Sequence, residues 1–463
     1  MPANILNLPS YRITKVTELN HDYHVHAEVA APITACIHCQ SDKIVGFGRR
    51  ERLIKDIPMH GQRVGIYVDA RRIQCRGCDK TFYEILPDVA EGREMTARLA
   101  KWIGEQSLKR PFLAISEETG IDEKSVRNIF RDYVAELEKT IKFDTPKWLG
   151  IDEIYLIKPR CVITNIQNRT IVDMLVNRNK DTVAKYLFRL EERKNIQYVA
   201  MDMWQPYKEA VRAVLPDARI VVDKFHVVRM ANVAMESVRK ATRAELTLKQ
   251  RRGLMHDRFV LLKREHDLND KEALLLSGWT SNYPLLGMAH RLKEEFYGIW
   301  DAPDHYEALQ AYKDWTRSIP TELEPHFQPI LTAFNNWLPE IMGYFEHPIT
   351  NAYTESLNNL VRVMNRSGRG YSFEALRAKM LFTEGLHKHK QSRPKFEKRP
   401  VKEKIQIEND ELMLIPSLAA YSMSAPAKPL QLHQPKPPKP YVPEKNYGVD
   451  MESLIAMLER GEI

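Results

Sequence analysis

Three acidic residues stand at positions where their carboxylates could together bind divalent metal ions. Asp152 and Asp202 come near the ends of the apolar segments GIDEIYL and VAMDMW, and Glu355 lies among small polar residues in TNAYTESLNNL. An ionised carboxylate at the end of a buried strand must be paired or bound to a metal ion. Divalent ions such as Mg²⁺ or Mn²⁺ prefer carboxylate oxygens, and two of them about 3.5–4 Å apart promote phosphodiester chemistry. The alternative for Asp152 and Asp202 is a helix cap or a salt bridge, and for Glu355 it is a solvated helix face.

Basic residues surround the third acid. Arg362, Arg366 and Arg369 follow Glu355 closely, and residues 361–404 hold 13 Lys and Arg against 4 Glu, a local charge of +9. That value exceeds the net charge of +8 for all 463 residues, so the basic character is concentrated here. A basic segment next to metal-binding carboxylates favours a polyanionic partner such as nucleic acid.

Two Cys-x-x-Cys pairs predict a structural metal site. Thirty-five residues separate CIHC, with Cys36 and Cys39, from CRGC, with Cys75 and Cys78. Two such turns can complete a tetrahedral zinc site, and four thiolates leave no open position for catalysis. The intervening KIVGFGRRERLIKDIP and QRVGIYVDARRIQC alternate like strands, so a small sheet would bring the pairs together. Nearby His38 and His60 are less favoured substitute ligands.

The elements that must position these groups begin with a helical region after the second cysteine pair. Residues 96–109 have helical spacing, and FLAISEETGIDEKSVRNIF has a glycine turn between two short apolar helices. This spacing is typical of a helix-turn-helix, although an ordinary helical hairpin would have it too. The second helix would present four residues to phosphates and base edges: Lys124, Arg127, Asn128 and Arg131.

From Lys147 the pattern becomes mixed. KWLGIDEIYL, CVITNIQNRTIVDMLV, NKDTVAKYLFRLEER, IQYVAMDMW, QPYKEAVRAVLP and ARIVVDKFHVV predict the order β-β-β-α-β-α-β, with Asp223 and His226 in the fifth strand. Ligands of such sheets gather at strand ends. Residues 227–345 then read as helices rich in tryptophan, for which packing is the favoured role.

The layout resembles the insertion-sequence transposases of the ISL3 family, within the DDE transposases that have a ribonuclease H-like core. The resemblance rests on both cysteine pairs, the helix-turn-helix, GIDEI, VAMDMWQPYKEAV, PDARIVVDKFHVVR and TNAYTESLNNLVRVMNRSGRGYSFEALR. It implies that Asp152, Asp202 and Glu355 are the catalytic, Mg²⁺-binding acids. Asp223 and His226 match a signature of related enzymes and would support the core. Asp223 also ends a strand, so it is the alternative second acid.

The resemblance covers residues 30–395 and implies a multidomain α+β protein. We expect an N-terminal extension (1–30), a zinc-binding β domain (31–90), a helix-turn-helix domain (91–142), a ribonuclease H-like core (146–228 and 347–393) interrupted by an all-helical insertion (229–346), a Pro/Lys-rich flexible tail (394–447) and a C-terminal helix (448–463).

The function implied is DNA transposition. The protein would bind terminal inverted repeats, cut the phosphodiester backbone and join the freed 3′ ends to target DNA, as a homodimer in the bacterial cytoplasm and nucleoid, without a membrane segment. Two alternatives remain: a catalytically inactive DNA-binding regulator derived from a transposase, and a ribonuclease H-like nuclease without strand transfer.

Overall fold

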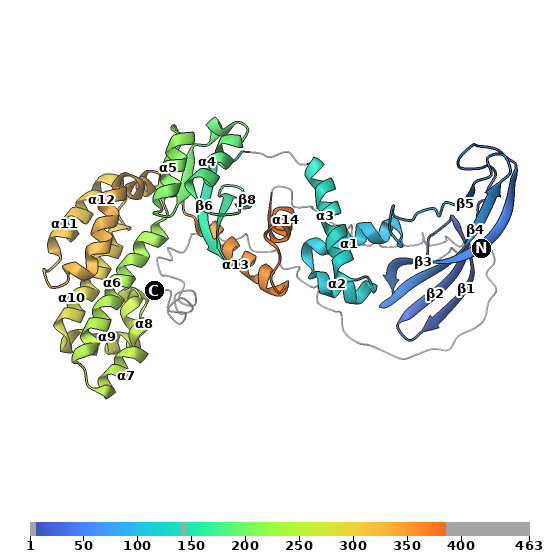
Figure 1. The fold of residues 1–463 in the computed structure, drawn as a ribbon. Coiled ribbons are helices and arrows are strands. Elements are labelled where there is room, and N and C mark those ends of the chain that lie inside the picture. The colour runs from blue at the N-terminus through green and yellow to red at the C-terminus, as the bar shows by residue number, and fades with distance from the viewer. Residues whose placement is uncertain (1–5, 141–144, 386–463) are drawn as a thin grey trace, which may run out of the picture. The chain divides into compact units, whose positions relative to one another are not determined.

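The computed structural model describes residues 6–140 and 145–385, which form two β-sheets and a series of helices (Figure 1). The predicted tail at 394–447 and the predicted helix at 448–463 lie outside the described residues. Within the described ranges, no helix combines the length and the apolar character that crossing a bilayer requires.

The first sheet contains the predicted strands between the cysteine pairs. Its order is β1-β2-β4-β3, with β5 paired to β4. The strands are β1 (Tyr11–Leu19), β2 (Asp22–Val29), β3 (Ile44–Met59), β4 (Gln62–Cys75) and β5 (Thr81–Tyr83). The segment predicted as an N-terminal extension therefore supplies two strands of this sheet. It does so because Val25 and Ala27 are buried in one apolar cluster with Ile66 and Val68 of β4, which β2 pairs in parallel.

Three helices follow as the helical spacing predicts: α1 (Ala97–Lys109), α2 (Phe112–Thr119) and α3 (Glu123–Thr140). The Thr96 side chain accepts a hydrogen bond from the backbone of the first turn and caps α1. Gly120 ends α2 with a φ of 66°, a left-handed conformation that glycine adopts without strain. The turn directs α3 back across α1 and α2, whose apolar residues share one core with it.

The second sheet has the order β10-β9-β6-β7-β8. The predicted sequence of elements is confirmed: β6 (Trp148–Tyr155), β7 (Pro159–Asn165), β8 (Thr170–Leu175), α4 (Lys180–Arg189), β9 (Tyr198–Met201), α5 (Gln205–Val214) and β10 (Arg219–Val222). The predicted fifth strand is too long. It ends at Val222 because the Asp223 side chain accepts a hydrogen bond from the Phe225 backbone and caps α6 (Lys224–Thr242), so that His226 lies on a helix.

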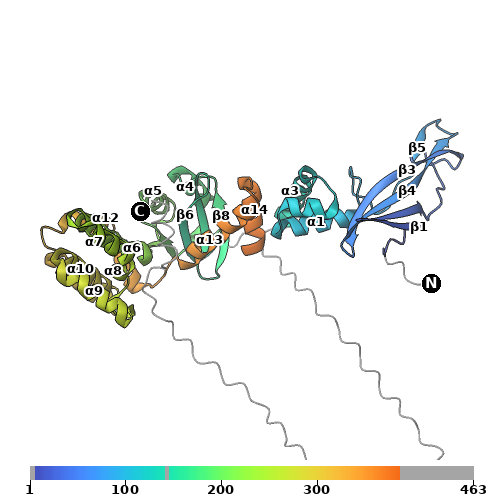
Figure 2. The same ribbon diagram turned by 90° about the horizontal axis from the view of Figure 1, so that it is seen from below.

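Helices cover both faces of this sheet (Figures 1 and 2). Helices α4 and α5 pack on one face, where Leu149 and Ile151 of β6 join their apolar side chains. Helices α13 (Ala352–Ser367) and α14 (Phe373–Glu384) pack on the other face around Ile154. Asp152 alternates with Ile151, so its side chain points toward α13.

Helices α6 to α12 lie between β10 and α13 and share one apolar cluster. The others are α7 (Leu248–His256), α8 (Arg258–Leu262), α9 (Asp270–Asn282), α10 (Pro284–Ile299), α11 (His305–Ser318) and α12 (Glu324–Glu346). Trp300, Trp315 and Trp337 are buried in this cluster and Trp279 packs against it, so the predicted packing role of these tryptophans is confirmed.

Candidate active site

Three aspartates lie side by side at the carboxyl ends of neighbouring strands of the second sheet. The neighbouring strands β6, β9 and β10 run parallel, and Ile151 pairs with Met201, which pairs with Val222. The residue that follows each of these three is an aspartate: Asp152, Asp202 and Asp223. Because adjacent strands are about 4.8 Å apart, this register alone brings the three carboxylates to one edge. Both candidates for the second acid therefore reach the same place.

Helix α13 carries Glu355 to this edge through buried polar contacts. The Asn351 amide donates to the Ile151 carbonyl at 3.2 Å, and the Thr354 hydroxyl lies 2.7 Å from the Thr164 hydroxyl. Both α13 side chains are fully buried. They fit because residue 150 is glycine, at which a Cβ would lie 2.8 Å or less from all three of these polar side chains.

Asn358, one turn beyond Thr354, holds the first aspartate in place. Its amide donates to Asp152 Oδ2 at 2.7 Å, while the Glu153 backbone N–H donates to Asp152 Oδ1 at 2.7 Å. Both carboxylate oxygens of this buried residue are thus fixed in direction. Thr354 and Asn358 lie on one face of α13, Asn351 directly precedes the helix, and Glu355 lies beside that face.

His226 lies between the acids. Its Nε2 is 3.0 Å from Asp202 Oδ1 and 3.3 Å from Glu355 Oε1. Two groups of possible metal ligands share this imidazole, one with Asp152 and Asp202 and the other with Asp223 and Glu355, and within each group the ligand atoms lie within 4.8 Å of one another. The three predicted acids are thus brought to one site, and the two predicted supporting residues lie inside it.

Burial is the main reason why the pKa values of the three aspartates are raised. Burial, followed by the charge of Asp202, raises the pKa of Asp152 well above its usual range. Burial also raises the pKa of Asp202, and it raises the pKa of Asp223 to about 7. Burial alone would lower the pKa of His226, but the charge of Asp202 and the hydrogen bond to Glu355 outweigh it and raise the pKa to about 9.

The donor set fits divalent cations. Mg²⁺ and Mn²⁺ prefer carboxylate oxygens, which Asp152 on β6, Asp202 just after β9 and Glu355 on α13 provide. The buried Asp223 Oδ2 has no hydrogen-bond partner among the described residues, and an unpaired buried carboxylate oxygen is unfavourable. A cation held by the other acids would offset the mutual repulsion of the carboxylates around it.

The three predicted arginines continue from the site along α13. Arg362 and Arg366 follow Glu355 by two and three helical turns, which places them on the same side of the helix. Arg362 is partly buried and its guanidinium donates to Asn359 Oδ1. Arg366 is exposed, and Arg369 lies just past the end of the helix, also exposed. The basic surface thus extends away from the carboxylates.

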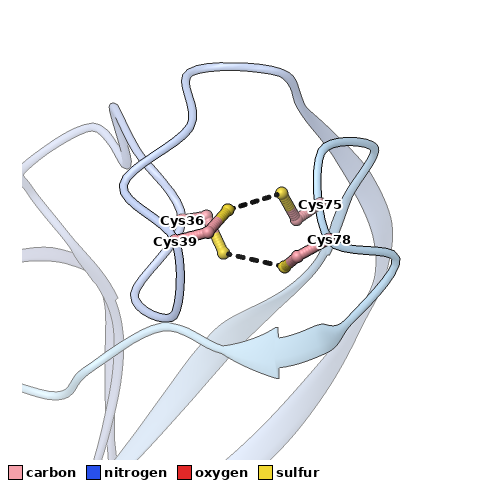
Figure 3. Close-up of side chains that lie close together, drawn as sticks. All are labelled: Cys36, Cys39, Cys75 and Cys78. Carbon is pink, nitrogen blue, oxygen red and sulfur yellow. Dashed lines mark hydrogen bonds between the residues drawn. The ribbon is translucent and has the colours of Figure 1, made fainter.

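The four paired cysteines converge as predicted (Figure 3). The sulfur atoms of Cys36 and Cys78 are 3.8 Å apart, and those of Cys39 and Cys75 are 3.6 Å apart. Ligands about 2.3 Å from a tetrahedral zinc ion would be separated by about 3.8 Å. Backbone N–H groups of His38 and Gly77 point at two of the sulfurs, which favours thiolates. The His38 and His60 rings are not in this cluster.

The predicted DNA-contacting residues of α3 lie on its outer side. Lys124, Arg127 and Arg131 are exposed and Asn128 is partly buried. Arg127 also pairs with Glu123 at 2.6 Å, one turn earlier, and Arg131 donates to the Asn128 side chain. Three of the four side chains therefore face solvent on the helix that a helix-turn-helix uses for recognition.

Sequence reasoning missed the residues that support the site. Asn351, Thr354 and Asn358 are polar yet buried, and their spacing of three and four residues on one helix was the available signal. Two further acids of this sheet are held in ion pairs: Asp173 on β8 is buried and pairs with Arg377 at 2.6 Å, and Glu153 on β6 pairs with Arg178.

Comparisons with known proteins agree with this architecture. The family model described as Transposase, DDE_Tnp_ISL3, matches residues 149–380, which span the second sheet through α14. A model for the zinc-finger of transposase IS204/IS1001/IS1096/IS1165 matches residues 33–78, and one for the helix-turn-helix domain of transposase family ISL3 matches residues 84–134. The zinc-finger match and the cysteine cluster together support a structural zinc ion.

Two curated relatives are similar over most of the chain. The transposase for insertion sequence element IS1001 of Bordetella parapertussis is 23% identical over 363 residues, which is 75% of this chain and 87% of the relative. The transposase for insertion sequence element IS1557 of Mycobacterium tuberculosis is 23% identical over 305 residues, 59% of this chain and 68% of the relative. The chain belongs to the ISL3 family of insertion-sequence transposases, enzymes that act on DNA.

Proposed function

We propose that this transposase cuts phosphodiester bonds at the ends of its insertion sequence with a DDE site made of Asp152, Asp202 and Glu355. The observation that carries the proposal is the register of the parallel strands, which aligns Asp152 and Asp202, together with the seat on β6 that brings Glu355 to them. The sheet order, with a central β6 and helices on both faces, supports a ribonuclease H-like core.

The three acids would hold two Mg²⁺ or Mn²⁺ ions. Bound there, the ions would polarise the scissile phosphate and stabilise charge on the attacking and leaving oxygens. The protein's own share is positioning. Asn358 fixes the direction of the Asp152 carboxylate, and His226 lies within 3.3 Å of both Asp202 and Glu355. Held in this way, the acids need little rearrangement when a substrate arrives.

Arg362, Arg366 and Arg369 would neutralise phosphates of the strand that leads away from the cut. Each would contribute as a charged contact that is independent of base sequence and weakens with salt. The exposed residues of α3 would read the terminal inverted repeats, because the second helix of this motif enters the major groove. Zinc would stabilise the sheet whose end carries the cysteines.

The cut would free a 3′-hydroxyl, which attacks target DNA at the same site. Joining repeats the in-line displacement, so the same carboxylates serve both steps. Two copies of the chain would hold two element ends.

The proposed domains of the chain are the zinc-binding β domain with β1 and β2 added, the helix-turn-helix, and the interrupted core, with the helices between β10 and α13 as the insertion in that core. The bacterial nucleoid is the expected location.

A cleavage assay with Glu355→Gln tests the proposal. The substrate is duplex DNA carrying the terminal repeats that flank the gene for this chain, with Mg²⁺ or with EDTA. We expect wild type to cut only with Mg²⁺, and Glu355→Gln to cut about a thousandfold more slowly or not at all, with unchanged affinity for the ends. Glu374→Gln, an exposed acid at the start of α14, is the control and should cut normally.

The same assay separates the alternatives. Binding without any Mg²⁺-dependent cutting by wild type would indicate a regulator. Cutting without joining of the 3′ ends to a target plasmid would indicate a nuclease. Undiminished cutting by Glu355→Gln would refute the assignment of the third acid.

A further inference from the structure

A cavity of about 380 Å³ adjoins the carboxylates and shares residues with them. Asp202 and His226 line part of the cavity, and other charged and apolar side chains line the rest. The remaining lining residues are Glu153, Arg178, Met203, Trp204, Tyr207, Arg229, Met230 and Val233. Its size is at the lower end of the range for pockets that hold small organic groups.

Trp204 is the unusual member of this lining. It follows Asp202 by two residues and precedes α5, and 38% of its surface is exposed. The tryptophans between β10 and α13, by contrast, pack in or against an apolar core. An indole left partly open beside charged groups is available for a further contact, since its ring is apolar and its edge can form hydrogen bonds.

A charged pair holds the indole in place. The Arg178 guanidinium carbon lies 4.3 Å from the centre of the Trp204 ring, a cation–π contact, and Arg178 is itself paired with Glu153. Glu153 follows Asp152 on β6, so the position of the indole is tied to the strand that carries the first acid. Trp204 is therefore a fixed platform with an open part.

The chemistry of the lining suits a flat, aromatic, hydrogen-bonding group. Indole and methionine side chains stack well on nucleobases, and Glu153 and Arg178 offer an acceptor and donors to base edges. Because Asp202 belongs to both the cavity and the acid cluster, a DNA strand with its phosphate at the acids would place the neighbouring nucleotide at the cavity.

We propose that this cavity receives one unpaired nucleobase from the nucleotide beside the scissile phosphate, stacked on Trp204. The inference rests on the proposed function, since it takes the acids as the place of the phosphate. Drawing one base out of the duplex would fix the backbone in register with the carboxylates. Trp204 is thus a positioning residue for the DNA strand.

Photo-cross-linking tests the contact without any cutting. Duplexes carry 5-iodouracil at one position at a time on either side of the scissile bond, and complexes form with Ca²⁺ in place of Mg²⁺. Irradiation should attach one of these positions to Trp204, as mass spectrometry of the peptides would show. Trp204→Leu should abolish that adduct. Absence of an adduct at Trp204 from every position would overturn the proposal.

A rescue experiment tests the role. Trp204→Ala should cut the intact duplex about tenfold more slowly or worse, the loss expected for one stacked base, while Trp204→Phe stays near wild type. Removing the base at the cross-linking position should restore much of the rate to Trp204→Ala, because nothing then has to be unstacked. A wild-type rate in Trp204→Ala, or no rescue by the abasic site, would contradict the inference.

The two proposals fail in different ways. Wild type that forms the adduct at Trp204 but never cuts would refute the proposed chemistry and leave the base pocket standing. Wild type that cuts with Mg²⁺ but forms no adduct at Trp204 would refute the pocket and leave the chemistry standing.

Discussion

Asp202 and Asp223 occupy equivalent positions after neighbouring strands, but they differ in access. The Asp202 side chain is 24% exposed, whereas Asp223 is buried. One carboxylate oxygen of Asp223 also accepts the backbone hydrogen bond that caps α6. A phosphate arriving from solvent therefore meets Asp202 first. We expect Asp202→Asn to reduce Mg²⁺-dependent cutting about a thousandfold, and Asp223→Asn to reduce it far less, because asparagine caps a helix as well as aspartate does.

Single-turnover cutting of end-containing duplexes, with binding to the ends measured in parallel, distinguishes the two variants. Equal loss in both would mean that Asp223 also binds a cation. Loss in Asp223→Asn alone would move the second acid to that residue.

Individual residues of the site differ in how far sequence could predict them. Asp152 and Asp202 could be predicted because each places a charge near the end of an apolar strand. Glu355 could be predicted because it is an acid directly before a basic segment. The contact between Asn358 and Asp152 joins residues about two hundred positions apart, and no local pattern encodes such a pairing. The partial exposure of Trp204 likewise depends on the tertiary structure and has no local sequence signal.

At the scale of elements, α13 depends on one missing side chain in β6. A Cβ at residue 150 would overlap Thr164, Asn351 and Thr354, so Gly150→Ala should push α13 away from the sheet. We expect a loss of about 1–3 kcal/mol in unfolding free energy and a larger loss of cutting, since Glu355 moves with the helix. Gly46→Ala in β3, where nothing lies within 4 Å of the new methyl group, is the control for chemical denaturation and cleavage. Unchanged cutting by Gly150→Ala would show that this seat is not required.

The zinc-binding turns are a second element whose prediction is direct. Zinc content measured by mass spectrometry should be one ion per chain, and Cys75→Ser should abolish it together with tight binding to element ends. Cys161→Ser is the matched control, because that buried cysteine lies on β7, away from the cluster. Zinc retained in Cys75→Ser would contradict the four-cysteine site.

The order of elements in the second sheet was predictable because each strand and helix has its own periodicity. The residues at which these elements begin and end were harder to predict. The apolar run ARIVVDKFHVV reads as one strand, but the capping carboxylate of Asp223 turns its second half into a helix. Likewise the strands β1 and β2 have no local signal in residues 1–30, because the parallel pairing of β2 with β4 joins residues some forty positions apart.

At the scale of the whole molecule, α14 belongs to two cores. Its Leu376, Met380 and Leu381 pack with the second sheet and α13, whereas Ala378 and Phe382 are part of the apolar core of the helix-turn-helix. Between these, the buried Lys379 ammonium donates to the carbonyls of Ser107 and Arg110 at the end of α1. A helix that follows Glu355, the proposed third acid, thus completes the apolar core of the helix-turn-helix.

This sharing predicts that one change in α14 weakens DNA binding far from it in sequence. Phe382→Ala should leave a cavity in the helix-turn-helix core and lower the unfolding free energy by about 3–5 kcal/mol, with weaker binding to element ends because α3 loses support. Phe188→Ala, a 62% exposed phenylalanine on α4, should change stability by about 0.5 kcal/mol or less. Denaturant unfolding and end-binding titrations of both variants provide the measurement. If Phe382→Ala lost stability but bound the ends with wild-type affinity, the recognition helix would be held without α14, and the two cores would be independent.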